Sequence, residues 1–206
     1  MQYLYNITFN PADNRTSLTP YVPYSAAPDE DREIPRICFS DSIAHCIEAV
    51  GSSSRDLRTG GVIYARCVAL DSLDIDWLVP PETLYAKGLV PDALETMEHW
   101  YLRSTDVIRE AYRILDFSCE FDIAWTCIKR DDLSDIVNSY GHVPDGLERF
   151  MDAKSLYNHC VRYYDRHGMY DLEDAIYDDV ASLPWAQRLR INSLKLEQLP
   201  LRTVSE

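Results

Sequence analysis

Ser40 and Asp41 stand where an apolar segment turns directly into a helical pattern, a position at which a chain can hold a ligand. Residues 37–39 favour a short strand, and the four apolar residues that follow recur at the i, i+3, i+4, i+7 spacing of one helix face: Ile43, Cys46, Ile47 and Val50. Ser40 or Asp41 can cap this helix by accepting a hydrogen bond from a backbone N–H. Exposed N–H groups at such a junction can also bind a ligand. The segment is therefore interpreted either as part of a ligand site or as a capped structural helix.

The chain lacks the short motifs that mark the commonest hydrolases. The patterns GxGxxG, GxxxxGK[ST], HExxH and GxSxG and the EF-hand loop are all absent. This argues against most nucleotide hydrolases, zinc proteases and α/β-hydrolases. His159, Cys160 and His167 could suggest a metal site, but the two histidines are two helical turns apart and no second cluster supports them. We therefore expect no bound metal.

The cysteines and the apolar segments predict a cytoplasmic protein. No two of the six cysteines form a CxxC pair, and most lie among apolar residues, which is typical of reduced, buried thiols. There is no run of eighteen apolar residues, and the N-terminal residues lack the basic and apolar regions of a signal peptide. We therefore expect neither a membrane helix nor a secretion signal.

The net charge of −14 over 206 residues disfavours direct binding to nucleic acid, because both surfaces are negative. Two interpretations of the acidic surface remain open. It can be an ordinary solvated face, or it can offer carboxylates to a basic groove of another protein, as a nucleic-acid mimic would.

Residue patterns divide the chain near residue 130 into a mixed α/β part (1–130) and a helical extension (131–206). Strands are expected over 2–9, 62–70 and 98–104, with a long proline-containing loop over 10–33. The segment 107–128 is ambiguous between helix and strand. Helices are expected over the ranges 131–140, 145–168 and 171–183, followed by a last segment over 186–198.

Several short motifs in the first 120 residues resemble a family of small uncharacterised phage and mobile-element proteins. That family shows "LYHxS", "LxPxxP", "RVCFSxSIxxCL", a "YVY" strand, "VPD" and "TGExW" in one order. The corresponding segments of this chain occur in the same order and read LYNIT (4–8), LTPYVP (18–23), PRICFS (35–40), VIY (62–64), VPD (90–92) and TMEHW (96–100). The family is in turn similar to a minimal ADP-ribosyltransferase, including phage anti-CRISPR enzymes of that class.

The resemblance implies an α+β fold: an ADP-ribosyltransferase-like core with a mixed or antiparallel sheet, carrying a C-terminal helical extension. It also implies NAD as cofactor. Glu98 would be the catalytic carboxylate, which orients the nicotinamide ribose and offsets positive charge in the transition state. The cofactor-binding residues would be Tyr5, Asn6, Ser40 and Tyr64, with a tyrosine ring available to stack on nicotinamide.

This chain departs from the family pattern at two of these places. Asn6 stands where the family has a histidine, and it keeps hydrogen-bonding capacity but lacks the ring. Met97 replaces the glycine that precedes the glutamate. Both substitutions lie beside residues that the resemblance assigns to the site.

Two functions of different classes follow. The first is a phage or mobile-element accessory protein in the host cytosol that acts on a host protein, with NAD-dependent ADP-ribosylation as its chemistry. The second is a non-enzymatic acidic inhibitor that binds a basic groove of a host defence complex. The enzymatic interpretation requires Glu98, Asn6 and Ser40 to converge in one cleft, although they lie on separate expected strands.

Overall fold

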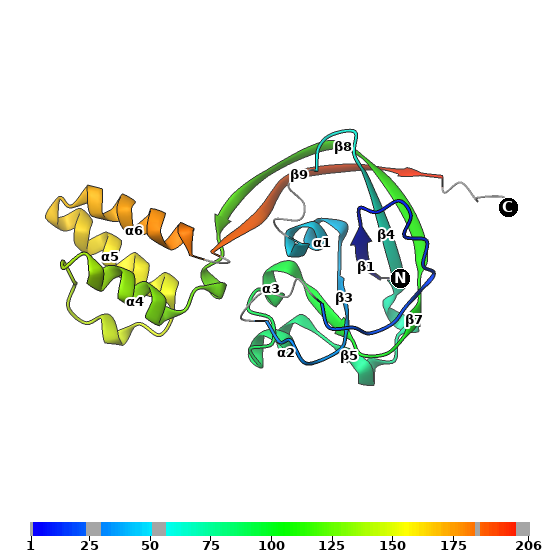
Figure 1. The fold of residues 1–206 in the computed structure, drawn as a ribbon, viewed down its shortest axis with the longest axis horizontal. Coiled ribbons are helices and arrows are strands. Elements are labelled where there is room, and N and C mark those ends of the chain that lie inside the picture. Colours follow the sequence, from blue (N-terminus) through cyan, green and yellow to red (C-terminus); the bar gives the residue numbers. More distant parts are fainter. Residues whose placement is uncertain (1, 24–29, 51–56, 184–185, 201–206) are drawn as a thin grey trace. The chain divides into compact units, whose positions relative to one another are not determined.

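The computed structural model describes residues 2–23, 30–50, 57–183 and 186–200, and these form an α+β fold with six helices and a mostly antiparallel sheet (Figure 1). The strands of the main sheet are β1 (Tyr3–Thr8), β3 (Ile37–Ser40), β4 (Val62–Ala69), β5 (Leu78–Val79), β6 (Glu98–Tyr101), β8 (Ile108–Ile123) and β9 (Gln187–Leu199). A small second sheet pairs β2 (Ser17–Leu18) with β7 (Thr105–Asp106). The helices are α1 (Ile43–Val50), α2 (Pro81–Ala86), α3 (Ala93–Thr96), α4 (Arg130–Ser139), α5 (Ala153–His167) and α6 (Tyr170–Ser182).

The main sheet has the strand order β5-β6-β3-β1-β4-β8-β9. The pairings β1–β3, β1–β4, β3–β6, β4–β8 and β5–β6 are all antiparallel. β1 and β4 share six residue pairs and β3 and β6 share four, whereas β1 and β3 share the single pair Tyr5–Ser40. The ladder between β1 and β3 is therefore much shorter than the ladders on either side of it.

Side chains alternate between the two faces of the sheet along each strand. Each face is covered by an apolar core. On one face, Ile43 and Ile47 of α1 pack against Ile63, Ala65 and Ile114. On the other face, the core contains residues from the strands and from the connecting segments: Leu4, Leu18, Ile37, Phe39, Val68, Leu73, Leu78, Tyr101 and Val107.

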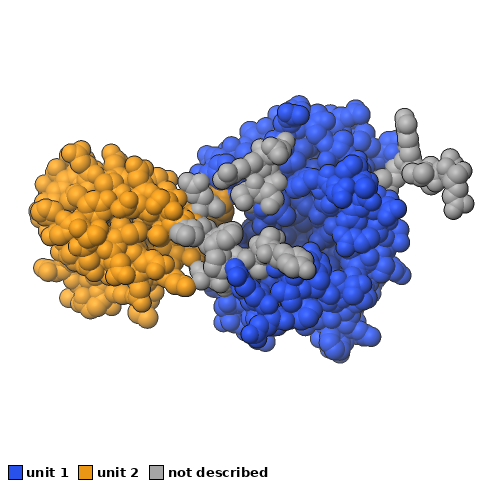
Figure 2. Space-filling view, viewed as in Figure 1, with its two compact units in different colours: residues 1–121, 189–206 blue, residues 122–188 orange. Residues whose placement is uncertain are grey.

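The chain divides into two compact units, residues 1–121 with 189–206 and residues 122–188 (Figure 2). The second unit contains α4, α5 and α6 around its own apolar core, in which Leu133, Val137, Leu156 and Val180 are fully buried. Asp152 begins α5 by accepting a hydrogen bond from the Ser155 backbone N–H at 2.8 Å.

The expected helical extension 131–206 differs from the structure at its end. Residues 187–199 form β9 and not a helix, and they belong to the sheet unit. Leu189, Ile191, Leu194 and Leu196 of β9 pack against the α1 side of the sheet. This tertiary burial overrides the helix-forming tendency of a segment rich in leucine, arginine and lysine.

Two further expected secondary-structure segments differ from the structure. The ambiguous segment 107–128 is mainly the long strand β8, which pairs with β4. The helix expected over 145–168 begins only at Ala153, because Gly146 takes a left-handed conformation (φ 81°) in a separate short turn. No described helix is long and apolar enough to cross a membrane.

The fold predicts that the helical unit can be removed but β9 cannot. A chain in which a short Gly-containing turn replaces residues 122–188 should keep its strand signal in circular dichroism and unfold cooperatively, because β8 and β9 then form a hairpin. A chain that ends at Arg130 should lose at least about 2–5 kcal/mol, the scale of one large core truncation, because it also loses Leu189, which is 2 % exposed.

Urea denaturation of both chains measures the difference. Equal stability of the two shortened chains would contradict the assignment of β9 to the sheet unit.

Candidate functional site

Strand register places three of the residues predicted from sequence in one row across the sheet. Ser40 of β3 pairs with Glu98 of β6 on one side and with Tyr5 of β1 on the other. Residues directly opposite in antiparallel strands point to the same face, with Cβ atoms about 4.5–5.5 Å apart. Glu98, Ser40 and Tyr5 therefore share a face, although they are far apart in the sequence.

Glu98 is a buried carboxylate, with 8 % of its surface exposed. The indole Nε1–H of Trp100 donates a hydrogen bond to its Oε1 at 2.7 Å, and the Cys38 thiol lies beside the same group. Burial, and then the neighbouring Glu30, raise the pKa of Glu98 to about 7, although the bond from Trp100 opposes this shift. A carboxyl group that titrates near neutral pH can bind a ligand hydroxyl or transfer a proton.

Ser40 and Tyr5 are tied to α1 through Cys46. The Cys46 thiol donates to the Tyr5 carbonyl oxygen at 3.1 Å and also interacts with Ser40, which is 3 % exposed. Burial raises the pKa of the Cys46 thiol to about 12, so this group stays protonated and acts as a donor. Burial, and then the nearby Cys67 and Glu110, raise the pKa of Tyr5.

Asn6 follows Tyr5 in β1, so strand alternation places it on the opposite face, where it pairs with Arg66 of β4. Its side chain nevertheless reaches β3, because Nδ2 donates to the Cys38 carbonyl oxygen at 2.9 Å. This bond forms where the ladder between β1 and β3 has only the Tyr5–Ser40 pair. The Asn6 Oδ1 atom is buried and accepts no hydrogen bond from the described residues.

The structure does not place Tyr64 in the row of Glu98. Tyr64 lies on β4 opposite Thr8 and Ala111, on the face of Asn6 and Arg66. The predicted residues therefore form two groups. Tyr5, Ser40 and Glu98 share one face, whereas Asn6 and Tyr64 share the other, and β3 connects the groups through the Asn6–Cys38 bond.

Sequence reasoning missed a buried arginine next to this row. Arg36 is fully buried, and its guanidinium lies 3.9 Å from the centre of the Trp100 ring. Its Nη2 pairs with Glu30, while its Nη1 donates to the Ile34 carbonyl oxygen at 3.0 Å. The available signals were an arginine at the start of an apolar strand and a tryptophan two residues after Glu98 on the same face.

Met97, directly before Glu98, has a left-handed backbone (φ 49°, ψ 42°). It is the one residue other than glycine with positive φ among the described residues. This conformation costs an ordinary residue about 1–2 kcal/mol. Glycine adopts this conformation without that cost, so Met97 places backbone strain directly before the Glu98 carboxylate.

The helix cap predicted at Ser40 or Asp41 is wrong, because Ser42 has this role. The Ser42 Oγ accepts a hydrogen bond from the His45 backbone N–H at 3.1 Å, while Asp41 pairs with the His45 ring. Val50, expected on the buried stripe of α1, is 37 % exposed.

The cysteines and histidines of the described chain show no metal centre. All six cysteines are present as thiols. Within the described residues, no three His, Cys, Asp or Glu side chains are grouped so that they could hold a metal ion. His159 and His167 instead contact the backbone carbonyl oxygens of Asp145 and Tyr163.

Comparisons of this chain with protein-family models, with curated proteins and with solved structures found no match.

The burial of Glu98 predicts a pH-dependent stability. A folded-state pKa of about 7, raised from 4.5, means that the folded chain keeps a proton that the unfolded chain releases. The free energy of unfolding should therefore fall by about 3 kcal/mol as pH rises from 4.5 through 7. Glu98→Gln keeps the shape of the side chain and should abolish this contribution, which urea denaturation at pH 5 and pH 8 measures.

Glu120→Gln, at an exposed position on β8, serves as the matched control and should follow the wild type. If the stability difference between wild type and Glu98→Gln is the same at both pH values, Glu98 does not titrate in this range.

Proposed function

We propose that this protein modifies another protein by NAD-dependent ADP-ribosylation, with Glu98 as the catalytic carboxylate. The observation that carries the proposal is the row Tyr5–Ser40–Glu98, which joins residues from three strands on one face. The motif resemblance assigns each of these residues to the catalytic or cofactor site. These residues are far apart in the sequence, so proximity along the chain does not explain why they share this row.

The polar atoms near β3 suit a ligand rich in hydrogen-bond donors. The buried Asn6 Oδ1 lacks a donor among the described residues, and an unsatisfied buried acceptor is costly. A carboxamide N–H or a ribose hydroxyl of NAD would satisfy it. Asn6 and Tyr64 lie on the face opposite Glu98, so this acceptor belongs to a different side of the sheet from the row Tyr5–Ser40–Glu98.

Glu98 would act in its ionised form. Its carboxylate would accept a hydrogen bond from a ribose hydroxyl and offset the positive charge that develops as nicotinamide leaves. The bond from Trp100 Nε1 holds one carboxylate oxygen in a fixed direction, which favours a preorganised site. Because the pKa of Glu98 is about 7, activity should rise as pH increases through 7.

A second candidate function is the non-enzymatic acidic inhibitor, and the composition of α6 favours it. Between Tyr170 and Ser182 the chain has five acidic residues and no lysine or arginine: Asp171, Glu173, Asp174, Asp178 and Asp179. Tyr170 and Tyr177 are 60 % and 44 % exposed on this helix. Exposed tyrosines beside carboxylates suit the binding of a basic protein surface.

Asp171, Asp174 and Asp178 are exposed at intervals of three and four residues, about 4.5 and 6 Å along the helix axis, so they lie on one side of α6.

The enzymatic proposal is tested with water as acceptor, because the protein substrate is not identified. Purified protein with NAD should release nicotinamide, and Glu98→Gln should lower the rate at least about 100-fold, the scale of losing one electrostatic contact to the transition state. Glu120→Gln should retain the wild-type rate. If the wild type neither releases nicotinamide nor transfers label from NAD to proteins of a host extract, the enzymatic proposal fails.

The acidic-inhibitor candidate is tested by calorimetry with an oligo-lysine peptide. Neutralising Asp171, Asp174 and Asp178 together as asparagine should weaken binding about 10-fold or more. The same charge change at three exposed acidic positions of the sheet unit should weaken it much less, and these are Asp76, Asp106 and Glu120. Equal losses in both triple variants would show only a general charge effect.

A further inference from the structure

The face of the sheet opposite Glu98 carries two arginines directly across from each other. Arg66 of β4 pairs with Arg109 of β8 on one side and with Asn6 of β1 on the other. These three side chains therefore share a face. Like charges directly opposite in a sheet are destabilising, so the pair needs a compensating negative charge.

Arg66 is almost fully enclosed, at 6 % exposure. Its Nη1 donates to Asp13 Oδ2 at 2.9 Å and its Nη2 to the Ile7 carbonyl oxygen at 3.3 Å. Its Nε–H is buried and has no acceptor among the described residues. Asp13 thus compensates the charge of Arg66.

Asp13 does not compensate a second arginine across the sheet, because it already serves Arg15. Arg15 donates to Asp13 Oδ1 through Nε at 2.9 Å and to Oδ2 through Nη2 at 2.6 Å. One carboxylate is therefore shared by two guanidinium groups. The Arg15 side chain is 57 % exposed and lies at the solvent side of this group.

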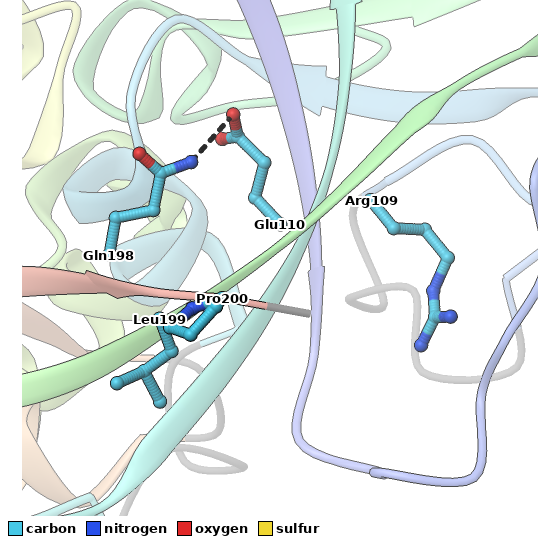
Figure 3. Close-up of a pocket in the computed structure, with 5 residues that line it drawn as sticks. All are labelled: Arg109, Glu110, Gln198, Leu199 and Pro200. Atoms are coloured by element: carbon cyan, nitrogen blue, oxygen red, sulfur yellow. Dashed lines mark hydrogen bonds between the residues drawn. The ribbon is translucent and has the colours of Figure 1, made fainter. Parts of the chain in front are cut away.

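The Arg109 side chain makes no hydrogen bond or ion pair with any described residue. Figure 3 shows it extending away from Glu110 and Gln198, which bond to each other at 3.2 Å. Arg109 is partly exposed to solvent, and it also borders a pocket of about 360 Å³ whose other lining residues include Glu110 and Gln198. In a chain with net charge −14, Arg109 is therefore a cation opposite Arg66 that forms no ion pair with a described carboxylate.

We propose that Arg109, directly across the sheet from Arg66, binds the phosphate group of a small molecule. A planar guanidinium matches phosphate with two parallel N–H···O bonds, and a doubly charged anion would offset the repulsion between Arg109 and Arg66. Tyr64 lies on the same face, two residues before Arg66, and offers an aromatic surface to a nucleoside attached to that phosphate. The site is independent of Glu98, which is on the other face.

Thermal unfolding in the presence of inorganic phosphate tests this site, with chloride at matched ionic strength as reference. At a phosphate concentration ten times the Kd, the midpoint should rise by about 4 °C in the wild type. Arg109→Gln should lose this rise. Arg113→Gln should keep it, because Arg113 lies on the same strand and face but pairs with Glu197 at 3.2 Å.

Adenosine 5′-monophosphate forms a second arm that separates two sources of the phosphate group. A larger rise with the nucleotide than with inorganic phosphate identifies a nucleotide ligand, whereas equal rises identify free phosphate. Broadening of the phosphate ³¹P resonance by wild-type protein, and its loss in Arg109→Gln, gives a reading that does not depend on thermal stability. The proposal is overturned if phosphate stabilises neither protein, or stabilises wild type and Arg109→Gln equally.

Discussion

The pair Tyr5–Ser40 joins the two parts of the main sheet and sets the register of the row that contains Glu98. It is the one registered contact between β1 and β3, and so between the strands β5-β6-β3 and the strands β1-β4-β8-β9. Two side-chain bonds reinforce it, from Asn6 to the Cys38 carbonyl and from Cys46 to the Tyr5 carbonyl. At this short junction the Asn6 Oδ1 atom is buried without a donor among the described residues.

Two neighbouring side chains, Trp100 and Arg36, hold the Glu98 carboxylate in place. Arg36 packs on the Trp100 ring and pairs with Glu30, while Trp100 donates to Glu98. A buried arginine therefore orders the tryptophan that orients the carboxylate. The strained backbone of Met97 adds to this arrangement, because strain of this kind persists only where surrounding contacts enforce it.

Sequence patterns predicted the parts of this fold that depend on local preferences. Apolar spacing, turn residues and β-branched content predicted the strand–helix unit at 37–50, a strand over 62–70 and a helix over 171–183. The last two appear as β4 (Val62–Ala69) and α6 (Tyr170–Ser182). β9 could not be predicted in this way, because its leucines face a core formed by residues more than seventy positions earlier. The partners of Glu98 were equally hidden, since Trp100 and Arg36 meet only through the pairing of β3 with β6. Alternation along β1 separates Tyr5 from Asn6, and motif order alone does not reveal this.

The most direct test of the central claim is a crystal structure of the protein soaked with NAD. If Glu98 orients the cofactor, density for the nicotinamide ribose should appear at the β1–β3 junction, with a hydroxyl within about 2.6–3.2 Å of the Glu98 carboxylate. A crystal without NAD density there at saturating concentration, with Glu98 still enclosed beside Trp100, would contradict a catalytic role for Glu98.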